Sequence, residues 1–107
     1  VDRTDYLSID EQVYPKSYAL YANFPNPFNP ITQISFDLPI MTNVDLVIYN
    51  MLGQKVKTFN IPNASAGNHL ITWNATNELD APVSAGVYLY QLQTKGFVKT
   101  KKMILLK

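Results

Sequence analysis

The sequence predicts an all-β domain, an immunoglobulin-like antiparallel β-sandwich of about seven strands. Apolar and polar residues alternate with a period of two along most of the chain, and helical periodicity is nearly absent. Clusters of Pro, Gly and Asn break this alternation roughly every eight to twelve residues, which is typical of sandwiches and barrels. The 107 residues, with one Trp and no Cys, have room for one domain whose core needs no disulfide.

The first strands follow from alternation and turn chemistry. A short strand is expected at 18–21, and alternating runs predict strands at 33–38 and 44–49. The tetrapeptide Met51-Leu52-Gly53-Gln54 predicts a tight turn in which Gly53 takes a positive φ, so that the chain returns through Val56 as a hairpin.

The later strands follow in the same way. A loop with Pro62, Asn63, Ser65 and Gly67 is expected to lead into a strand at 69–73. After a long polar connection at 74–85, Gly86 opens a strand rich in β-branched and aromatic residues. A turn at Lys95-Gly96 then returns the chain as a final antiparallel strand at 97–106.

The first 17 residues differ from the rest. They are acidic and show no sustained alternation, so we expect a linker at 1–17 and an Ig-like domain at 18–107. The chain begins with Val instead of Met, and this indicates a piece of a longer protein with a domain upstream.

Charge and composition exclude several function classes. The net charge of +1 gives no field that would attract nucleic acid or an anionic membrane. Seven lysines fall in 46–107, four of them in the last nine positions, which indicates either a solvated edge strand that lysine protects against aggregation or a docking patch. No apolar run approaches the ~20 residues that a membrane-spanning helix needs, and no membrane insertion is expected.

No catalytic residue, metal ligand or cofactor site is predicted. His69 is the only histidine and is interpreted as a strand residue, on the face opposite Trp73. None of the serines considered (Ser35, Ser65, Ser84) has the surroundings of a nucleophile, and Asn77, Glu78 and Asp80 do not have EF-hand spacing. The motifs at Asn63 and Asn74 match the short N-glycosylation pattern, which arises often by chance.

The segment 23–30, Asn-Phe-Pro-Asn-Pro-Phe-Asn-Pro, is the most unusual part of the chain. Its three prolines remove backbone donors and favour extended conformations before them, so we expect a stiff lead-in that holds Phe24 and Phe28 over the end of the core. Two interpretations remain open: a rigid rim that closes the sandwich, or a preformed ligand for another protein.

Five blocks of the chain, in order, resemble the C-terminal sorting domains of the type IX secretion system, in the FlgD-like Ig family. They span 18–107 and read YANFPNPFNPITQISFDLP, VDLVIYNMLGQKVKTF, AGNHLITWNA, SAGVYLYQLQ and KTKKMILLK. The family commonly has Gly where Ala75 and Asp80 stand here, so a different backbone geometry is expected in that loop. By the same resemblance, Gly53, Gly67, Trp73, Gly86 and Tyr88 define the fold.

The resemblance implies a secretion signal that carries an upstream cargo domain through the periplasm and outer membrane to the cell surface or the medium. The implied partners are the outer-membrane secretion machinery and a cell-surface sortase. We expect Met103 to Leu106 to hold the last strand while its lysines face the machinery. The candidate recognition residues are Pro25, Asn26, Pro27, Phe28, Asn29, Pro30, Lys99, Lys101 and Lys102.

Two other functions share this fold class. One is an assembly module like the Ig domain of the flagellar hook cap, against which the proline segment and the lysine-rich ending argue. The other is a carbohydrate-binding module, which needs exposed aromatic side chains; Trp73 is expected to be buried instead, and Tyr88 and Tyr90 to reach the rim with their hydroxyls.

Overall fold

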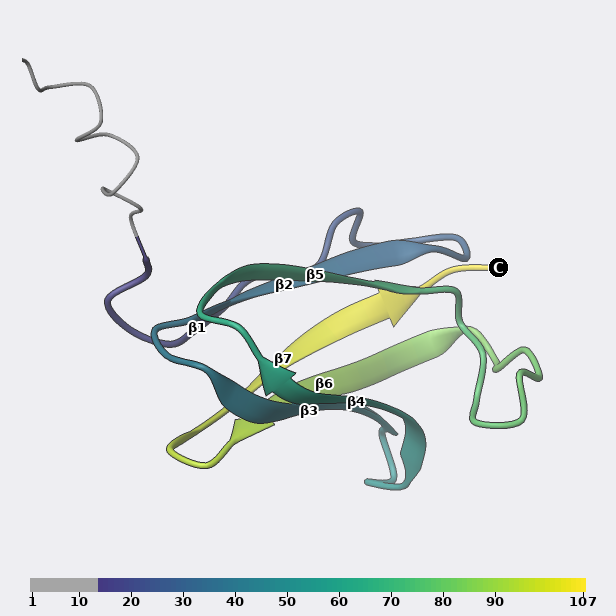
Figure 1. Cartoon of the computed structure of the whole chain (residues 1–107). Coiled ribbons are helices and arrows are strands. Elements are labelled where there is room, and N and C mark those ends of the chain that lie inside the picture. Colours follow the sequence, from purple (N-terminus) through teal and green to yellow (C-terminus); the bar gives the residue numbers. More distant parts are fainter. Residues whose placement is uncertain (1–13) are drawn as a thin grey trace, which may run out of the picture.

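The computed structural model describes residues 14–107 as two antiparallel sheets packed face to face, as Figure 1 shows. One sheet has the order β1-β2-β5 and the other the order β4-β3-β6-β7. The predicted Ig-like sandwich is confirmed; the linker predicted at 1–17 stays a prediction, since residues 1–13 lie outside the described part. The strands are β1 (Ala19–Leu20), β2 (Thr32–Leu38), β3 (Thr42–Asn50), β4 (Lys55–Ala64), β5 (Gly67–Trp73), β6 (Gly86–Thr94) and β7 (Phe97–Leu105).

The core lies between the two sheets and is built from the inward positions of each strand. In β2, residues 32, 34, 36 and 38 are buried while the residues between them are more exposed, which is the period of two that the sequence shows. Trp73, Phe28, Phe36 and Tyr90 are the largest buried side chains. These rings fill the layer between the sheets, and the predicted burial of Trp73 is confirmed.

The turn between β3 and β4 is organised by Asn50 and Gly53. The Asn50 side-chain oxygen accepts hydrogen bonds from the amides of Leu52 (2.9 Å) and Gln54 (3.0 Å). Gly53 has φ 82°, and an added Cβ would meet no atom within 4 Å. The backbone angle, and not lack of space, therefore favours glycine here, which confirms the predicted turn.

The prediction of a loop at Pro62 and Asn63 is wrong, because β4 continues through both residues to Ala64. Among the described strands, β4 pairs with β3 alone, and the register shifts between Thr42 and Val44, opposite these two residues. Proline is tolerated at a bulge on an edge strand because it lacks only a donor that the sheet does not use. Asn63 takes φ 53° there, and its amide donates to the Asn43 side chain at 2.7 Å.

The described chain enters and leaves the sandwich at opposite ends. Figure 1 shows the start of the described chain, in purple, at the end where β6 turns into β7, and the C-terminus at the other end, beside the start of β2 and the loop between β5 and β6. Strand β7 runs the length of the domain between these ends. Tyr18 stacks on Phe97 at the entry end, with ring centroids 5.0 Å apart.

Candidate functional site

The proline segment and the last strand, which the sequence marks separately, are joined to each other. The Phe28 amide donates to the Ile104 carbonyl (3.0 Å), and the Leu106 amide donates to the Phe28 carbonyl (2.8 Å). The Asn26 side-chain oxygen accepts from the Ile104 amide at 3.0 Å. Phe28 thus pairs with the free edge of β7 as a one-residue parallel bridge.

Phe28 and Phe24 have opposite environments. Phe28 is buried, and its ring lies 5.8 Å from the Trp73 ring, so it closes the end of the core as expected. The prediction that Phe24 also covers the core is wrong, since Phe24 is 77% exposed. Its backbone pairs with Gln33 on β2, which turns the ring outward. The segment is therefore a rim whose outer surface carries a free aromatic ring.

A buried polar cluster beneath this segment was not predicted. The Asn23 amide donates to the Tyr90 hydroxyl (2.9 Å), which in turn donates to the Tyr21 carbonyl (2.8 Å). Thr32 donates to the Pro25 carbonyl at 2.8 Å and accepts from the Asn23 side chain at 3.0 Å. The expected placement of the Tyr90 hydroxyl at the rim is wrong, because the whole side chain is buried. The sequence signal that could have predicted this cluster is Thr32, a polar residue at an inward position of β2.

Replacing Tyr90 by phenylalanine is expected to cost about 1–3 kcal/mol, because the Asn23 amide and the Tyr21 carbonyl then lose a buried partner. Urea unfolding measures this cost. Tyr49→Phe is the matched control, since within residues 14–107 the Tyr49 hydroxyl accepts a single long bond, of 3.3 Å, from Gln93. An equal cost in both variants would contradict the assigned role of Tyr90.

The same hydroxyl links stability to alkaline pH. Burial raises the pKa of Tyr90, although its hydrogen bond with Asn23 lowers it in part. Tyrosine in the unfolded chain ionises near pH ~10, so the contribution of Tyr90 is complete below that pH and is lost as the pH rises toward the folded-state value. Unfolding measured between about pH 8 and 11.5 should show a shallower alkaline decline in Tyr90→Phe than in the parent.

The three candidate lysines of β7 do not share one face. Lys99 and Lys101 pair with Leu92 and Tyr90 and so lie on the core-facing side, whereas Lys102 pairs with Leu89 on the outer side. Lys99 and Lys102 are exposed, and Lys101 is half-buried. The expectation that residues 103–106 all hold the strand is half wrong: Met103 and Leu105 are buried, but Ile104 and Leu106 are 37% and 51% exposed. Alternation along the strand explains this difference.

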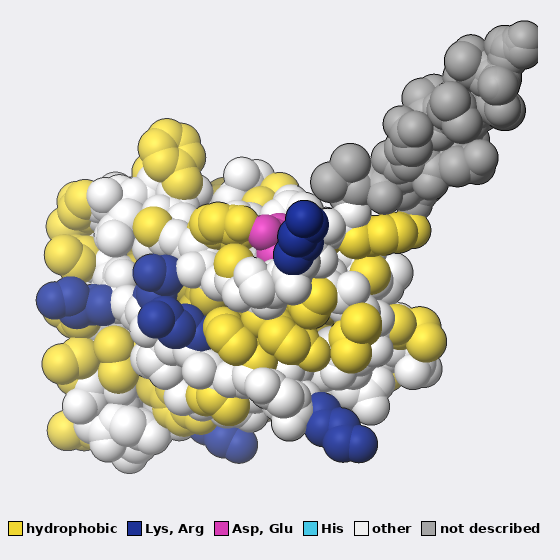
Figure 2. All heavy atoms as spheres, turned by 90° about the vertical axis from the view of Figure 1, so that its left-hand side faces the viewer, with side chains coloured by type: hydrophobic (Ala, Val, Ile, Leu, Met, Phe, Trp, Pro, Cys, Tyr) yellow, Lys and Arg dark blue, Asp and Glu magenta, His cyan; other side chains and the backbone are white. Residues whose placement is uncertain are grey.

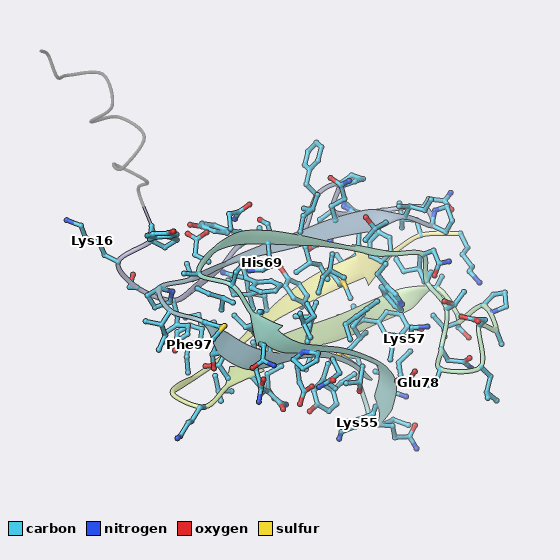
Figure 3. All side chains as sticks on the ribbon, in the orientation of Figure 1. Lys16, Lys55, Lys57, His69, Glu78 and Phe97 are labelled. Atoms are coloured by element: carbon cyan, nitrogen blue, oxygen red, sulfur yellow. The ribbon has the colours of Figure 1, made fainter. Side chains whose placement is uncertain are left out.

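The loop at 74–85 folds onto the opposite edge of the same sheet, beside β4. The Thr58 amide donates to the Glu78 carboxylate at 2.6 Å, and Lys57 contacts the Asn77 carbonyl (3.3 Å) and Asp80 (3.4 Å). The Asn77 side-chain oxygen accepts from the amides of Leu79 and Ala81, so its polar atoms shape the turn. Figure 3 shows Lys57 and Glu78 together at this edge.

Replacing Glu78 by alanine is expected to free the Thr58 amide, whose hydrogen exchange should accelerate about tenfold, while stability falls by about 1 kcal/mol or less. The pair is exposed, so the energetic effect is small. Hydrogen exchange followed by NMR measures it. Leu79→Ala is the control, because Leu79 is 87% exposed in the same loop; unchanged exchange at Thr58 in Glu78→Ala would contradict the contact.

Two residues of this loop take backbone angles that favour glycine. Ala75 and Asp80 have φ 62° and 61°, which lie in the left-handed region. Residues other than glycine adopt this region at a cost of about 1–2 kcal/mol each. The predicted difference from the backbone geometry of the family stays a prediction. The Trp73 indole bonds the Thr76 carbonyl at 2.9 Å and helps to hold this conformation.

The residues considered for other functions have structural roles. Trp73 is buried and lies edge-on to Tyr88 at 5.5 Å, so it offers no platform for a sugar ring. His69 stacks on Phe36 at 5.3 Å. Its expected face was wrong, because residues 69, 71 and 73 alternate onto the same side of β5. Within residues 14–107, no group of His, Cys, Asp and Glu could hold a metal, and no helix could cross a bilayer.

A comparison with known protein families finds one family that matches most of this chain. The model of one family, described as the secretion system C-terminal sorting domain, matches residues 22–106. The chain belongs to this family. As a sorting domain it is a secretion signal, and it marks a protein for export to the cell surface or the extracellular space. The matched range begins just before the proline segment and ends at Leu106, so it includes both joined elements. No curated protein sequence matches the chain.

Solved structures share the fold of the sorting domain. Dimeric latent PorU from Porphyromonas gingivalis matches with a TM-score of 0.67 and 22% identity, over 83% of this chain and 9% of that chain. PorZ, a surface component of the type IX secretion system of P. gingivalis, matches with 0.58 and 17%, over 82% and 11%. FlgD from P. aeruginosa matches with 0.57 and 23%, over 70% and 59%. The chain thus spans only a part of each, and at these identities the likeness shows the fold.

Proposed function

We propose that the secretion machinery at the outer membrane recognises this sorting domain through the surface that the proline segment and the end of β7 build together. The domain performs no chemistry itself and acts as an address for a cargo domain upstream. A cell-surface sortase then processes the exported protein. The candidate residues on this surface are Pro25, Asn26, Pro27, Asn29 and Pro30 around the buried anchor Phe28, while Lys99, Lys101 and Lys102 follow along β7.

The observation that carries the proposal is the pairing of Phe28 with β7. Two segments 76 positions apart meet through the bonds of Phe28 with Ile104 and Leu106, so the surface exists only when the whole domain has folded. A machinery that recognises it would therefore select folded domains. Five of the prolines and asparagines of the segment, those at 25–27, 29 and 30, are exposed around the anchor.

Exposed apolar side chains flank this junction. Phe24, Ile31 and Leu106 are 77%, 50% and 51% exposed, although a hydrophobic side chain in a single domain gains by burial. Phe24 belongs to the proline segment, Ile31 lies between that segment and β2, and Leu106 follows the last residue of β7. A protein partner that covers them gains the hydrophobic contribution that the isolated domain leaves unused.

An export assay tests the proposal. The 107-residue chain is fused behind a signal peptide and a fluorescent reporter in a host that carries the secretion system. We expect the reporter at the surface or in the medium. In the triple variant Phe24→Ser, Ile31→Ser, Leu106→Ser, export should fall at least about tenfold while the domain stays folded, because all three side chains are exposed.

The matched control replaces three exposed apolar residues elsewhere, Met41, Leu52 and Leu70, by serine. Export of the control should equal that of the parent. Equal loss of export in both triple variants, or normal export of the first one, would contradict recognition at the junction.

A further inference from the structure

The free edge of β7 is closed at both ends and open in the middle. At the entry end Tyr18 stacks on Phe97, and at the other end Phe28 and Asn26 bond the backbone of Ile104. No described strand pairs with this side of β7 between these closures. The open stretch is Val98–Lys102, five residues at the edge of a four-stranded sheet.

The backbone of the open stretch is directed outward. The amide and carbonyl of Ile104 bond away from β6, to Asn26 and Phe28. In an antiparallel pair, alternate residues direct their backbone groups to the same side, so Val98, Thr100 and Lys102 also present theirs outward. Such a row of donors and acceptors is the template to which an added strand binds.

Two lysines flank this template on one face. Lys99 and Lys101 lie on the core-facing side of β7, which β1 approaches, and there Lys99 is exposed and Lys101 is half-buried. Within residues 14–107, neither lysine forms an ion pair with an acidic side chain. Figure 2, which looks onto the entry end, shows lysines beside hydrophobic side chains.

The charges decide which strand fits. If a second copy paired antiparallel along the whole open stretch, Lys99 would face Lys101 of the other copy in both directions, and like charges directly opposite each other destabilise a sheet. Carboxylates two positions apart on an incoming strand would instead lie opposite both lysines. The edge therefore disfavours its own copy and favours an acidic strand.

We propose that the open stretch Val98–Lys102 binds an extended acidic segment of a partner chain as an added strand, with alternate carboxylates against Lys99 and Lys101. This inference rests on the proposed function in that the partner is a component of the export machinery. The contact lies on the side of the domain where the upstream chain enters, apart from the junction at Phe28.

A defined peptide tests the inference on the whole 107-residue chain. The probe is Thr-Val-Glu-Val-Glu-Val-Thr with blocked ends, titrated into the isotopically labelled protein and followed by NMR. The amides of Val98, Thr100 and Lys102 should shift, and their hydrogen exchange should slow about tenfold at saturation. The same peptide with Lys in place of Glu should not bind.

Two variants of β7 separate charge from backbone pairing. The double variant Lys99→Glu, Lys101→Glu should weaken binding at least about tenfold, whereas Lys55→Glu, an exposed lysine on the other edge strand, should not. Thr100→Pro should abolish binding, because the lost amide points away from β6 and the sheet itself keeps its bonds. A melting curve confirms that each variant is folded.

Several results would overturn the inference. These are equal binding of the Lys peptide, peptide-induced shifts confined to other residues, or dimers of the chain that occupy the edge. The same holds if the three amides are already protected in the free chain and lose protection when residues 1–13 are removed. The peptide titration uses purified protein and does not depend on export. If the peptide fails to bind while the export assay gives its expected result, only this inference is overturned. If the peptide binds while the junction variant is exported normally, only the proposed function is overturned.

Discussion

Replacing Trp73 by alanine is expected to destabilise the domain by about 3–5 kcal/mol, the range for truncating a large buried aromatic side chain. The Trp73 ring is buried between Phe28 at 5.8 Å and Tyr88 at 5.5 Å, and its indole N–H is bonded to the Thr76 carbonyl. Truncation leaves a cavity where three elements meet and also releases the loop after β5. Single domains are typically stable by only ~5–15 kcal/mol, so much of the total would be lost.

Urea unfolding monitored by circular dichroism measures the effect. Leu70→Ala is the control: the residue lies in the same strand but is 57% exposed, so its truncation should cost about 0.5 kcal/mol or less. Similar costs for the two variants would show that Trp73 is not the centre of the core.

Replacing Phe28 by alanine is expected to cost about 3–5 kcal/mol and to detach the proline segment from β7. Its side chain is 1% exposed, and the same residue holds Ile104 and Leu106 through its backbone. Once the anchor is lost, the amides of Ile104 and Leu106 should exchange hydrogen at least about tenfold faster. If recognition takes place at this junction, export of a reporter fusion should fall with it.

Phe24→Ala provides a control from the same segment. Phe24 is 77% exposed, so truncation should change stability by about 0.5 kcal/mol or less and leave exchange at Ile104 and Leu106 unchanged. Hydrogen exchange and urea unfolding on the two variants measure both effects. Unchanged exchange at Ile104 and Leu106 in Phe28→Ala would mean that the segment does not depend on its buried ring.

Alternation predicts the strands well because each strand of a sandwich buries one face. Strands β2 and β6 follow it closely, whereas β3 departs from it at Val47, which is buried between Leu46 and Ile48. The turn at Gly53 is recognisable from its own residues. Prediction fails where the sheet context overrides a residue's usual preference. Pro62 lies inside a strand because the bulged edge of β4 does not need its amide, and no local pattern marks a strand as an edge.

The sequence predicts the two elements of the candidate site, the proline segment and the last strand, but it does not predict that they pair with each other. The prolines and the lysine-rich ending stand out in the sequence, but the bonds between Phe28 and β7 join positions too far apart for any local rule. Alternation does predict that Lys99 and Lys101 face one way and Lys102 the other, once the strand is known. Alternation along β6 places Tyr90 on the inward face, but the burial of its hydroxyl depends on the bonds with Asn23 and Tyr21.

The positions of residue 14 and the C-terminus at opposite ends of the sandwich have a mechanical consequence. A nine-residue strand such as β7 extends about 30 Å, so the junction at Phe28 lies about that distance from the end where the described chain enters the sandwich. Bulky cargo on the entry side would not shield the junction from a large receptor. The sandwich would thus serve as a rigid spacer, and one tail could be appended to cargo of very different shapes without redesign.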